Sequence, residues 1–575
     1  MHRIRNFKLL VGSCRALCAI AMKNALPSKC SKAGEVYGMM EEFLELSRRV
    51  SVQTIRGFVQ AVHKRIPPIF LEKEFVDLAE CTAGNDNVQR NFRSWLRRQQ
   101  WMKALPPPTT IQVNQVNSKL SEPNFLGLHS IFLIPDWSEL NFIIPLECHG
   151  DDAEMHKRRS FAICTVASAL LGPGIATWDH KLLLSCFDNS AAGESTATEI
   201  DCWICWGLVC AAAGVYLDHD WYGRPFSPDY MPDLYAKAGK QIAGPFRFVF
   251  AGHKGDQKYL HACYKFENYW TSEEMCRSCA ASKNGSSPMG YVHFGLGAQH
   301  RSTIYSTADF IRKCGSTPWL AIPGFAVERI WDDWLHIVDL AISPDACASA
   351  LLELTKSANS PWPARNQELR LELAYQEFAQ ACKREKVRNR APPFSLKTLK
   401  STTPGVFATL SQKHLSGAES VVMVKWLRSV TVLFSRANPD RYWLNLAAIF
   451  VNLAGMREEM SGYDCALPAE VIRKIETHYY LFRASYNYCA YDACGRSKML
   501  FKLRPKIHRL EHLVYDQTAV TCPLRTSTYG DEDMVGRIKM SAALCHPQGL
   551  GLQVLYRYAA YVGARWHRKS LSNEW

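Results

Sequence analysis

Two acidic positions in the first half of the chain follow runs of apolar residues. NFIIPLECHGDD, residues 141–152, ends on Asp151 and Asp152, and FRFVFAGHKGD, residues 246–256, ends on Asp256. Carboxylates held within a few Å repel one another unless a cation lies between them. Oxygen-only ligands of this kind suit Mg²⁺, which keeps most of its water and takes one or two carboxylates. The pattern indicates a divalent-metal site, although aspartate after a strand is also a common turn residue.

A second group of residues has the spacing of zinc ligands. Cys276 and Cys279 in EEMCRSC form a Cys-x-x-Cys pair, which is half of a zinc site. His293 or Cys263 would complete it, and unligated thiols are the alternative because no second pair follows nearby. Zn²⁺ is therefore a second candidate cofactor.

The sequence context of three later histidines indicates structural roles for them. His508 and His512 in PKIHRLEHL lie on one face of a helix by their i, i+4 spacing. No acid is arranged as in H-E-x-x-H, so we do not expect this pair to bind metal. His336 lies among apolar residues, which is typical of a histidine packed in a core.

An α/β sheet would bring the aspartates together. Within residues 125–315, the runs SIFLIPDW, NFIIPLECHGDD, SFAICTVASALLG, HKLLLSCFD and FRFVFAG predict strands. The segment from 196 to 217 is apolar nearly all round and predicts a central helix. Sites in open α/β sheets lie beyond strand ends. We expect the strands that lead to Asp151 and Asp256 to be neighbours.

The remaining sequence predicts mostly helices. Residues 1–120 show mixed helical patterning, and 316–500 is a series of amphipathic segments without a fixed repeat. Residues 501–575 contain YGDEDMVGRIKMS, which predicts a helix beginning just after Gly530. We expect this helix to bury the apolar side chains Val535, Ile538 and Ala542, and to approach the sheet closely at Gly536.

Composition limits the class of protein. The 575 residues are 47% hydrophobic and 21% charged, which predicts a globular chain of several domains. The net charge of +14 suits a polyanionic partner. The 21 scattered cysteines fit an intracellular protein with free thiols better than a secreted disulfide framework. The apolar run at 202–217 is too short to span a bilayer, which favours a buried helix. Arg15 interrupts the weak N-terminal apolar run, which argues against a signal or transit peptide.

Two basic segments are candidate DNA-contacting surfaces, with solvated helix faces as the alternative. Phosphate contacts of this kind set affinity and salt dependence but carry no sequence information. The residues are Arg90, Arg93, Arg97 and Arg98 in the first segment and Lys383 and Arg384 in the second.

The order of HGDD, GD, MCRSC, DWLH and YGDEDMVGRIK resembles that of transposases with an RNase H-like catalytic domain. The resemblance is to the group that holds the CACTA and Kyakuja–Dileera–Zisupton superfamilies, and to a multicopy transposon-derived protist family. It covers residues from about 140 to 550. It implies the following correspondences: Asp151 as first acid, Asp256 as second, Asp333 and His336 as the D-x-x-H pair, and Glu532 as third acid.

The resemblance implies a mixed RNase H-like sheet with flanking helices, interrupted by the helical insertion at 316–500 and completed by 501–575. It also implies two Mg²⁺ ions held by the three acids, and DNA strand cleavage and transfer. Asp152 and Asp533 are alternative ligands. The implied partner is double-stranded DNA of transposon ends and targets, with a homo-oligomer and a nuclear location as further expectations and no membrane. The rival interpretation is an inactive descendant that binds DNA or protein.

Overall fold

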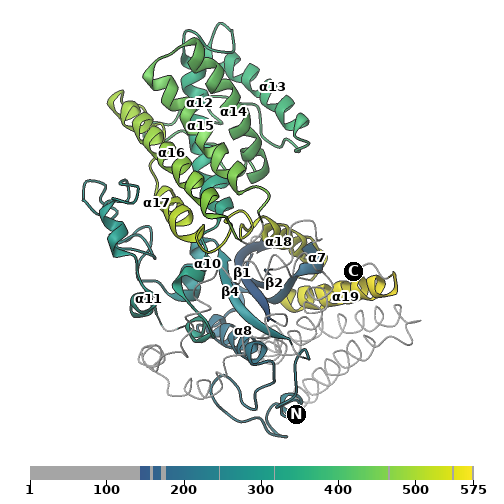
Figure 1. Ribbon diagram of the computed structural model, residues 1–575. Helices are drawn as coiled ribbons and strands as arrows, with labels where there is room; N and C mark the ends of the chain where they lie inside the picture. Colours follow the sequence, from purple (N-terminus) through teal and green to yellow (C-terminus); the bar gives the residue numbers. More distant parts are fainter. Residues whose placement is uncertain are drawn as a thin grey trace.

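The computed structural model describes residues 143–155, 159–169, 177–244, 246–315, 317–463, 466–546 and 549–572. The expectations for residues 1–120, for the strand at 130–137 and for the four arginines from Arg90 to Arg98 lie outside these residues. Within the described part, the fold is mixed α/β: one four-stranded sheet lies beneath a tall group of helices (Figure 1).

The sheet has the strand order β3-β2-β1-β4. Its strands are β1 (Ile143–Met155), β2 (Arg159–Ser168), β3 (Lys181–Asp188) and β4 (Arg247–Gly255). Strand β2 pairs antiparallel with both β1 and β3, whereas β4 pairs parallel with β1. The two strands that lead to the aspartates are therefore neighbours, as the sequence predicts.

We expected strand β1 to end at its aspartates, and this prediction is wrong. It stays paired with β2 as far as Met155, with Asp151 opposite Ile163 and Asp152 opposite Ala162. Its pairing with β4 ends earlier, at Gly150 and Gly255. The aspartates thus lie inside a strand, at the point where its parallel neighbour stops.

Four of the helices that share one hydrophobic core with the sheet contain eight or more residues. They are α8 (Thr196–Ala213), α10 (Gln257–Tyr264), α18 (Tyr529–Ala542) and α19 (Leu550–Ser572). Helix α8 is buried along most of its length, which confirms the central helix predicted from its composition. Helix α18 begins at Tyr529 and buries Val535, Ile538 and Ala542, also as predicted.

The expected close approach at Gly536 is wrong. A side chain there would meet nothing within 4 Å, so the glycine faces open space. The close contact occurs at Gly551 of α19, where a Cβ would lie 2.4 Å from the carbonyl oxygen of Cys186 in β3.

An irregular segment joins α10 to the helical part of the molecule. It contains η5 (Gln299–Thr303), α11 (Thr307–Lys313), η6 (Pro318–Ala321) and η7 (Val327–Arg329).

The upper part of the molecule has its own hydrophobic core, running in sequence from Trp334 to Cys522. No strand occurs in the described residues 317–463 and 466–500, in agreement with the helices expected there. The core continues beyond residue 500 because Ile507 and Leu510 of α17 belong to it. In Figure 1, α17 is drawn below α16. The helices are the π-helix η8 (Leu335–Ile342), α12 (Ser343–Lys356), α13 (Gln367–Arg384), α14 (Gly417–Ala437), α15 (Arg441–Met460), α16 (Ala469–Gly495), α17 (Pro505–His512) and the π-helix η9 (Leu513–Gln517).

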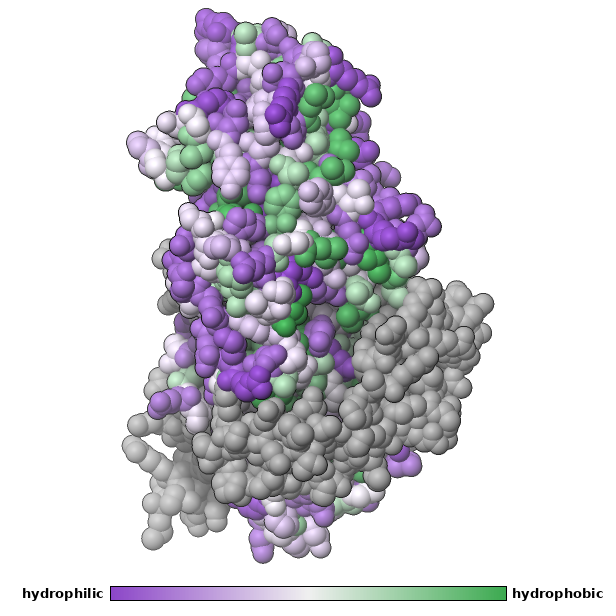
Figure 2. All heavy atoms as spheres, turned by 60° about the vertical axis from the view of Figure 1, so that its left-hand side comes forward, coloured by the Kyte–Doolittle hydropathy of each residue, from purple (hydrophilic) through white to green (hydrophobic). Residues whose placement is uncertain are grey.

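One helix in the described residues, Leu335–Lys356, is long and apolar enough to cross a membrane, and 89% of its most apolar stretch of 18 residues is buried inside the protein. The buried core helices of soluble proteins can have the same length and apolar composition. Figure 2 shows hydrophobic and hydrophilic side chains interspersed over the visible coloured surface, without a continuous apolar band.

Candidate functional site

The parallel ends of β1 and β4 bring Asp151 and Asp256 to one edge of the sheet. Each follows a glycine, and Gly150 and Gly255 are the last paired residues of the two strands. A Cβ on Gly150 would lie 1.8 Å from the ring of Tyr259, and one on Gly255 would lie 2.6 Å from the carbonyl oxygen of Gly150. The glycines therefore let α10 begin directly over the strand ends. Asp256 also caps this helix, accepting a hydrogen bond of 2.7 Å from the backbone N–H of Tyr259.

Glu532 reaches the same edge from α18. Burial, together with the negative charges of Glu532 and Asp256, raises the pKa of Asp151 to about 7. Burial also raises the pKa of Glu532, and the nearby charges of Asp333 and Asp531 act in the same direction. The charges of Glu532 and Asp256 thus disfavour the ionised form of Asp151, and an oxygen-only set of this kind fits a hard divalent cation.

Asp333 and His336 connect the helical part to the start of α18. The ring of His336 lies 2.5 Å from Asp333 through Nδ1 and 3.5 Å from Glu532 Oε1 through Nε2. Asp333 also accepts hydrogen bonds from Ser527 Oγ at 3.0 Å and from Thr528 N–H and Oγ1 at 2.9 and 2.6 Å. Despite burial, these contacts hold the pKa of Asp333 well below its usual range. His336 is therefore a neighbour of the acid cluster, not only the packed core histidine that its sequence favours.

The three consecutive acids of α18 have different partners. Buried Asp531 lies 2.7 Å from Lys181 Nζ and 3.0 Å from Lys254 Nζ. Half-exposed Asp533 accepts hydrogen bonds from Thr177 at 2.5 Å and from Arg537 at 2.7 Å. Within the described part of the chain, Glu532 forms an ion pair with His336 and no salt bridge with a lysine or arginine, so its carboxylate remains available to a cation.

Asp152 points away from this cluster because successive strand residues face opposite sides of a sheet. Its carboxylate lies 2.7 Å from Lys258 Nζ and accepts a hydrogen bond of 3.1 Å from the Asn189 amide. Asp151 is therefore the better placed of the two adjacent aspartates.

Lys506 is a residue that our sequence reasoning missed. It lies in the first turn of α17 and donates a hydrogen bond of 2.8 Å to the carbonyl oxygen of His336. Burial and the charge of Arg504 lower the pKa of Lys506, while Asp256 and Asp333 oppose this shift. The only sequence signal was a lysine directly after a helix-starting proline. A cation thus lies beside the acids.

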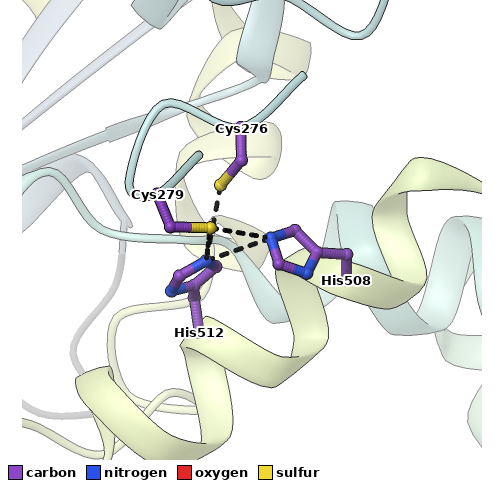
Figure 3. A group of neighbouring side chains, drawn as sticks. All are labelled: Cys276, Cys279, His508 and His512. Atoms are coloured by element: carbon purple, nitrogen blue, oxygen red, sulfur yellow. Dashed lines mark hydrogen bonds between the residues drawn. The ribbon is translucent and has the colours of Figure 1, made fainter. Parts of the chain in front are cut away.

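Four buried side chains form a second site, shown in Figure 3. Their candidate ligand atoms all lie within 4.8 Å of one another. Cys279 Sγ is 3.3 Å from each histidine Nε2, and Cys276 Sγ is 3.4 Å from His512 Nε2. The cysteines lie in the segment after α10, and the histidines lie on α17. The residues are Cys276, Cys279, His508 and His512.

This arrangement corrects our expectation for the cysteine pair. His293 is instead exposed and lies 3.0 Å from the carbonyl oxygen of Ser287, while Cys263 is buried in the core of the sheet. The histidines that complete the group are 229 and 233 positions away from Cys279. Two sulfur and two imidazole donors in a closed, buried group can hold a metal ion such as zinc.

Arg509 joins the two sites. It donates a hydrogen bond of 2.9 Å to Cys276 Sγ and one of 3.0 Å to Asp332, the residue before Asp333. The pKa of Cys276 lies well below its usual value because a hydrogen bond with Cys279 and the charge of Arg509 outweigh burial. Arg509 therefore favours the thiolate form that metal binding needs.

Lys383 and Arg384 are exposed at the end of α13, and their role in DNA binding stays a prediction. All described cysteines are free, and only Cys494 among them is exposed.

No protein-family model matches the chain, and no curated protein matches it significantly.

Proposed function

We propose that the chain is a transposon-derived, DDE transposase-like enzyme that cleaves and joins DNA strands by metal-dependent phosphoryl transfer. The observation that carries the proposal is the meeting of Asp151, Asp256 and Glu532. Asp151 lies in β1, Asp256 follows the adjacent strand β4, and Glu532 lies on a helix more than 270 positions later in the chain. Burial and the charges of the other two acids raise the pKa of Asp151 to about 7.

The topology supports an RNase H-like core as part of this proposal. Three antiparallel strands in sequence order are followed by a helix and then by a fourth strand that pairs parallel with the first. The last acid, Glu532, lies on α18. This helix follows the proposed helical insertion in the sequence and packs in the hydrophobic core of the sheet. These features suit the family pattern, in which the insertion separates the second and third acids.

Asp151, Asp256 and Glu532 would hold two Mg²⁺ ions, which supply activation of a water or 3′-hydroxyl and stabilisation of the leaving oxygen. His336 would orient Glu532, since its ring lies between that carboxylate and Asp333. Lys506 would contact the scissile phosphate, because its ammonium has three N–H donors and uses one of them on His336.

The Cys276, Cys279, His508 and His512 group would hold a structural Zn²⁺ ion. Its donor set contains four protein ligands, which is typical of structural sites, whereas catalytic zinc sites keep one position open. The proposed partner is double-stranded DNA in the nucleus, and the excess of basic residues supports a polyanionic partner.

A nicking assay on supercoiled plasmid DNA tests the proposal. The Glu532→Gln variant should lose Mg²⁺-dependent cleavage and still bind DNA, because it removes a metal ligand without changing the basic surface. Asp533→Asn, one position away, is the matched control and should cleave at the rate of the unmodified protein. Cleavage that persists in Glu532→Gln would overturn the assignment, and binding without cleavage by the unmodified protein would favour the inactive alternative.

A further inference from the structure

The candidate metal group of Figure 3 is surrounded by a second set of buried polar residues. A histidine that binds a metal through Nε2 carries its proton on Nδ1 and needs an acceptor there. Both histidines of the group direct Nε2 toward the cysteine sulfurs. Their Nδ1 atoms therefore show which residues would support the ligands.

The Nδ1 atom of His512 lies 2.6 Å from Asp516 Oδ2. Asp516 in turn accepts two hydrogen bonds from the guanidinium of Arg301, at 2.9 and 2.7 Å. This paired geometry fixes the carboxylate in its plane. The carboxylate is thus oriented before an ion binds.

The Nδ1 atom of His508 has the corresponding neighbour in Glu511, whose Oε2 lies 3.9 Å away. Glu511 also lies 3.3 Å from Nε2 of His300. All three side chains are fully buried, and His508 Nδ1, Glu511 Oε1 and His300 Nδ1 have no hydrogen-bond partner among the described residues. Buried atoms without partners are costly, so this half of the network is built for a proton that metal binding would place on His508 Nδ1.

We infer that Asp516 and Glu511 are the positioning residues of the metal centre, and that the consecutive residues Arg301 and His300 hold them in place. The two supports come from one short helix, η5 (Gln299–Thr303), and the two carboxylates come from the last turn of α17 and from η9. This inference rests on the proposed zinc role of the centre and is independent of DNA cleavage.

His300, His508 and Glu511 also lie close enough to hold an ion themselves. His508 belongs to both groups and would have to bridge two ions through its two ring nitrogens. We favour the supporting role, since a single ion on Nε2 explains the acceptor at Nδ1.

The test is the Zn²⁺ affinity of the full-length protein, stripped of metal and titrated against a competing chromogenic chelator. Asp516→Asn and Glu511→Gln keep the shape of each side chain and remove its charge. Each should weaken Zn²⁺ binding about 10- to 100-fold, the usual effect of losing an outer support of a histidine ligand. Asp492→Asn is the matched control, because Asp492 also pairs with an arginine and has the same 34% side-chain exposure as Asp516. It should bind Zn²⁺ like the unmodified protein.

A double variant separates positioning from a general effect on the fold. Arg301→Met should weaken Zn²⁺ binding less than Asp516→Asn does, and should add little in the Asp516→Asn background, because both act through one ligand. The absorption spectrum of bound Co²⁺ should shift in Asp516→Asn, as the tilt of His512 changes. Zn²⁺ affinities within twofold of the control would overturn the inference, as would an unmodified protein that binds no Zn²⁺. The inference would also be overturned if the unmodified protein bound two Zn²⁺ ions and Glu511→Gln bound only one, since Glu511 would then be a ligand.

Discussion

At the scale of single residues, the proton on Asp151 competes with a metal ion. Its pKa of about 7 arises from burial and from the charges of Glu532 and Asp256. A ligating carboxylate must be ionised, so protonation opposes metal binding at any pH below this value.

We therefore expect the affinity for Mn²⁺, used as a probe for Mg²⁺, to fall about tenfold for each pH unit below 7, and to level off above it. Titration calorimetry between about pH 6 and about pH 8 measures this dependence around the shifted pKa. Asp151→Asn should bind Mn²⁺ weakly and without this slope. A flat affinity in the unmodified protein would show that Asp151 is not a ligand.

Lys506 is the residue-scale case for phosphate contact. Lys506→Met should slow plasmid nicking by about 10²-fold, comparable to removing one donor that stabilises transition-state charge. Mn²⁺ affinity should stay equal or become tighter, because the change removes a cation near the acids. Lys425→Met removes a lysine paired with Glu385 on the exposed surface and should leave both quantities unchanged. Weakened Mn²⁺ binding in Lys506→Met would instead indicate a structural role.

At the scale of elements, α18 places three consecutive acids in three environments. Asp531 anchors the helix to Lys181 of β3 and Lys254 of β4. Glu532 faces the other acids, and Asp533 is a surface residue with 47% side-chain exposure. One helix thus joins an ionic anchor to a candidate metal ligand.

Amide variants of these acids should have three distinct effects on the free energy of unfolding at pH 7 without metal. Asp531→Asn should cost about 3 to 5 kcal/mol, since it leaves buried lysines short of an anion. Glu532→Gln should be neutral or stabilising, because a raised folded-state pKa means that its charge opposes folding above the unfolded pKa. Asp533→Asn should cost about 1 kcal/mol or less. Urea unfolding measures all three, and equal effects would contradict the assignment of environments.

The elements themselves were largely predictable because their signals are local. The strands around residues 142–188, helix α8 and the buried side of α18 follow from short-range apolar periodicity. The continuation of β1 past Asp151 was not predictable, since it depends on pairing with β2. The metal group was missed for the same reason: Cys279 and His508 are 229 positions apart, and neither pair has a complete ligand set alone.

At the scale of the whole molecule, there are two hydrophobic cores, and no residue in the described stretch between Phe266 and Phe310 belongs to either of them. The cysteines of the metal group, with Ala281, form a separate small cluster. Polar contacts tie the surrounding segment to the helical part. Tyr291 donates a hydrogen bond of 2.9 Å to the carbonyl oxygen of Leu503, and Arg277 one of 3.0 Å to Asp332. An ion shared by this segment and α17 would therefore be a major part of its attachment.

Removal of the ion should loosen this segment without unfolding the sheet. Hydrogen exchange of backbone amides between about residues 268 and 305 should accelerate on chelation, because regions with few buried apolar contacts open locally first. The amides of β1 and β4 should keep their protection, since they belong to the separate core of the sheet. Mass spectrometry of exchanged peptides resolves the two regions. Cys279→Ala should exchange like the chelated protein and no longer respond to chelator, whereas replacing the exposed Cys494 with alanine should change nothing. Acceleration that spreads evenly over sheet and segment would mean that the ion supports the whole fold, and unchanged exchange would mean that the polar contacts alone hold the segment to α17.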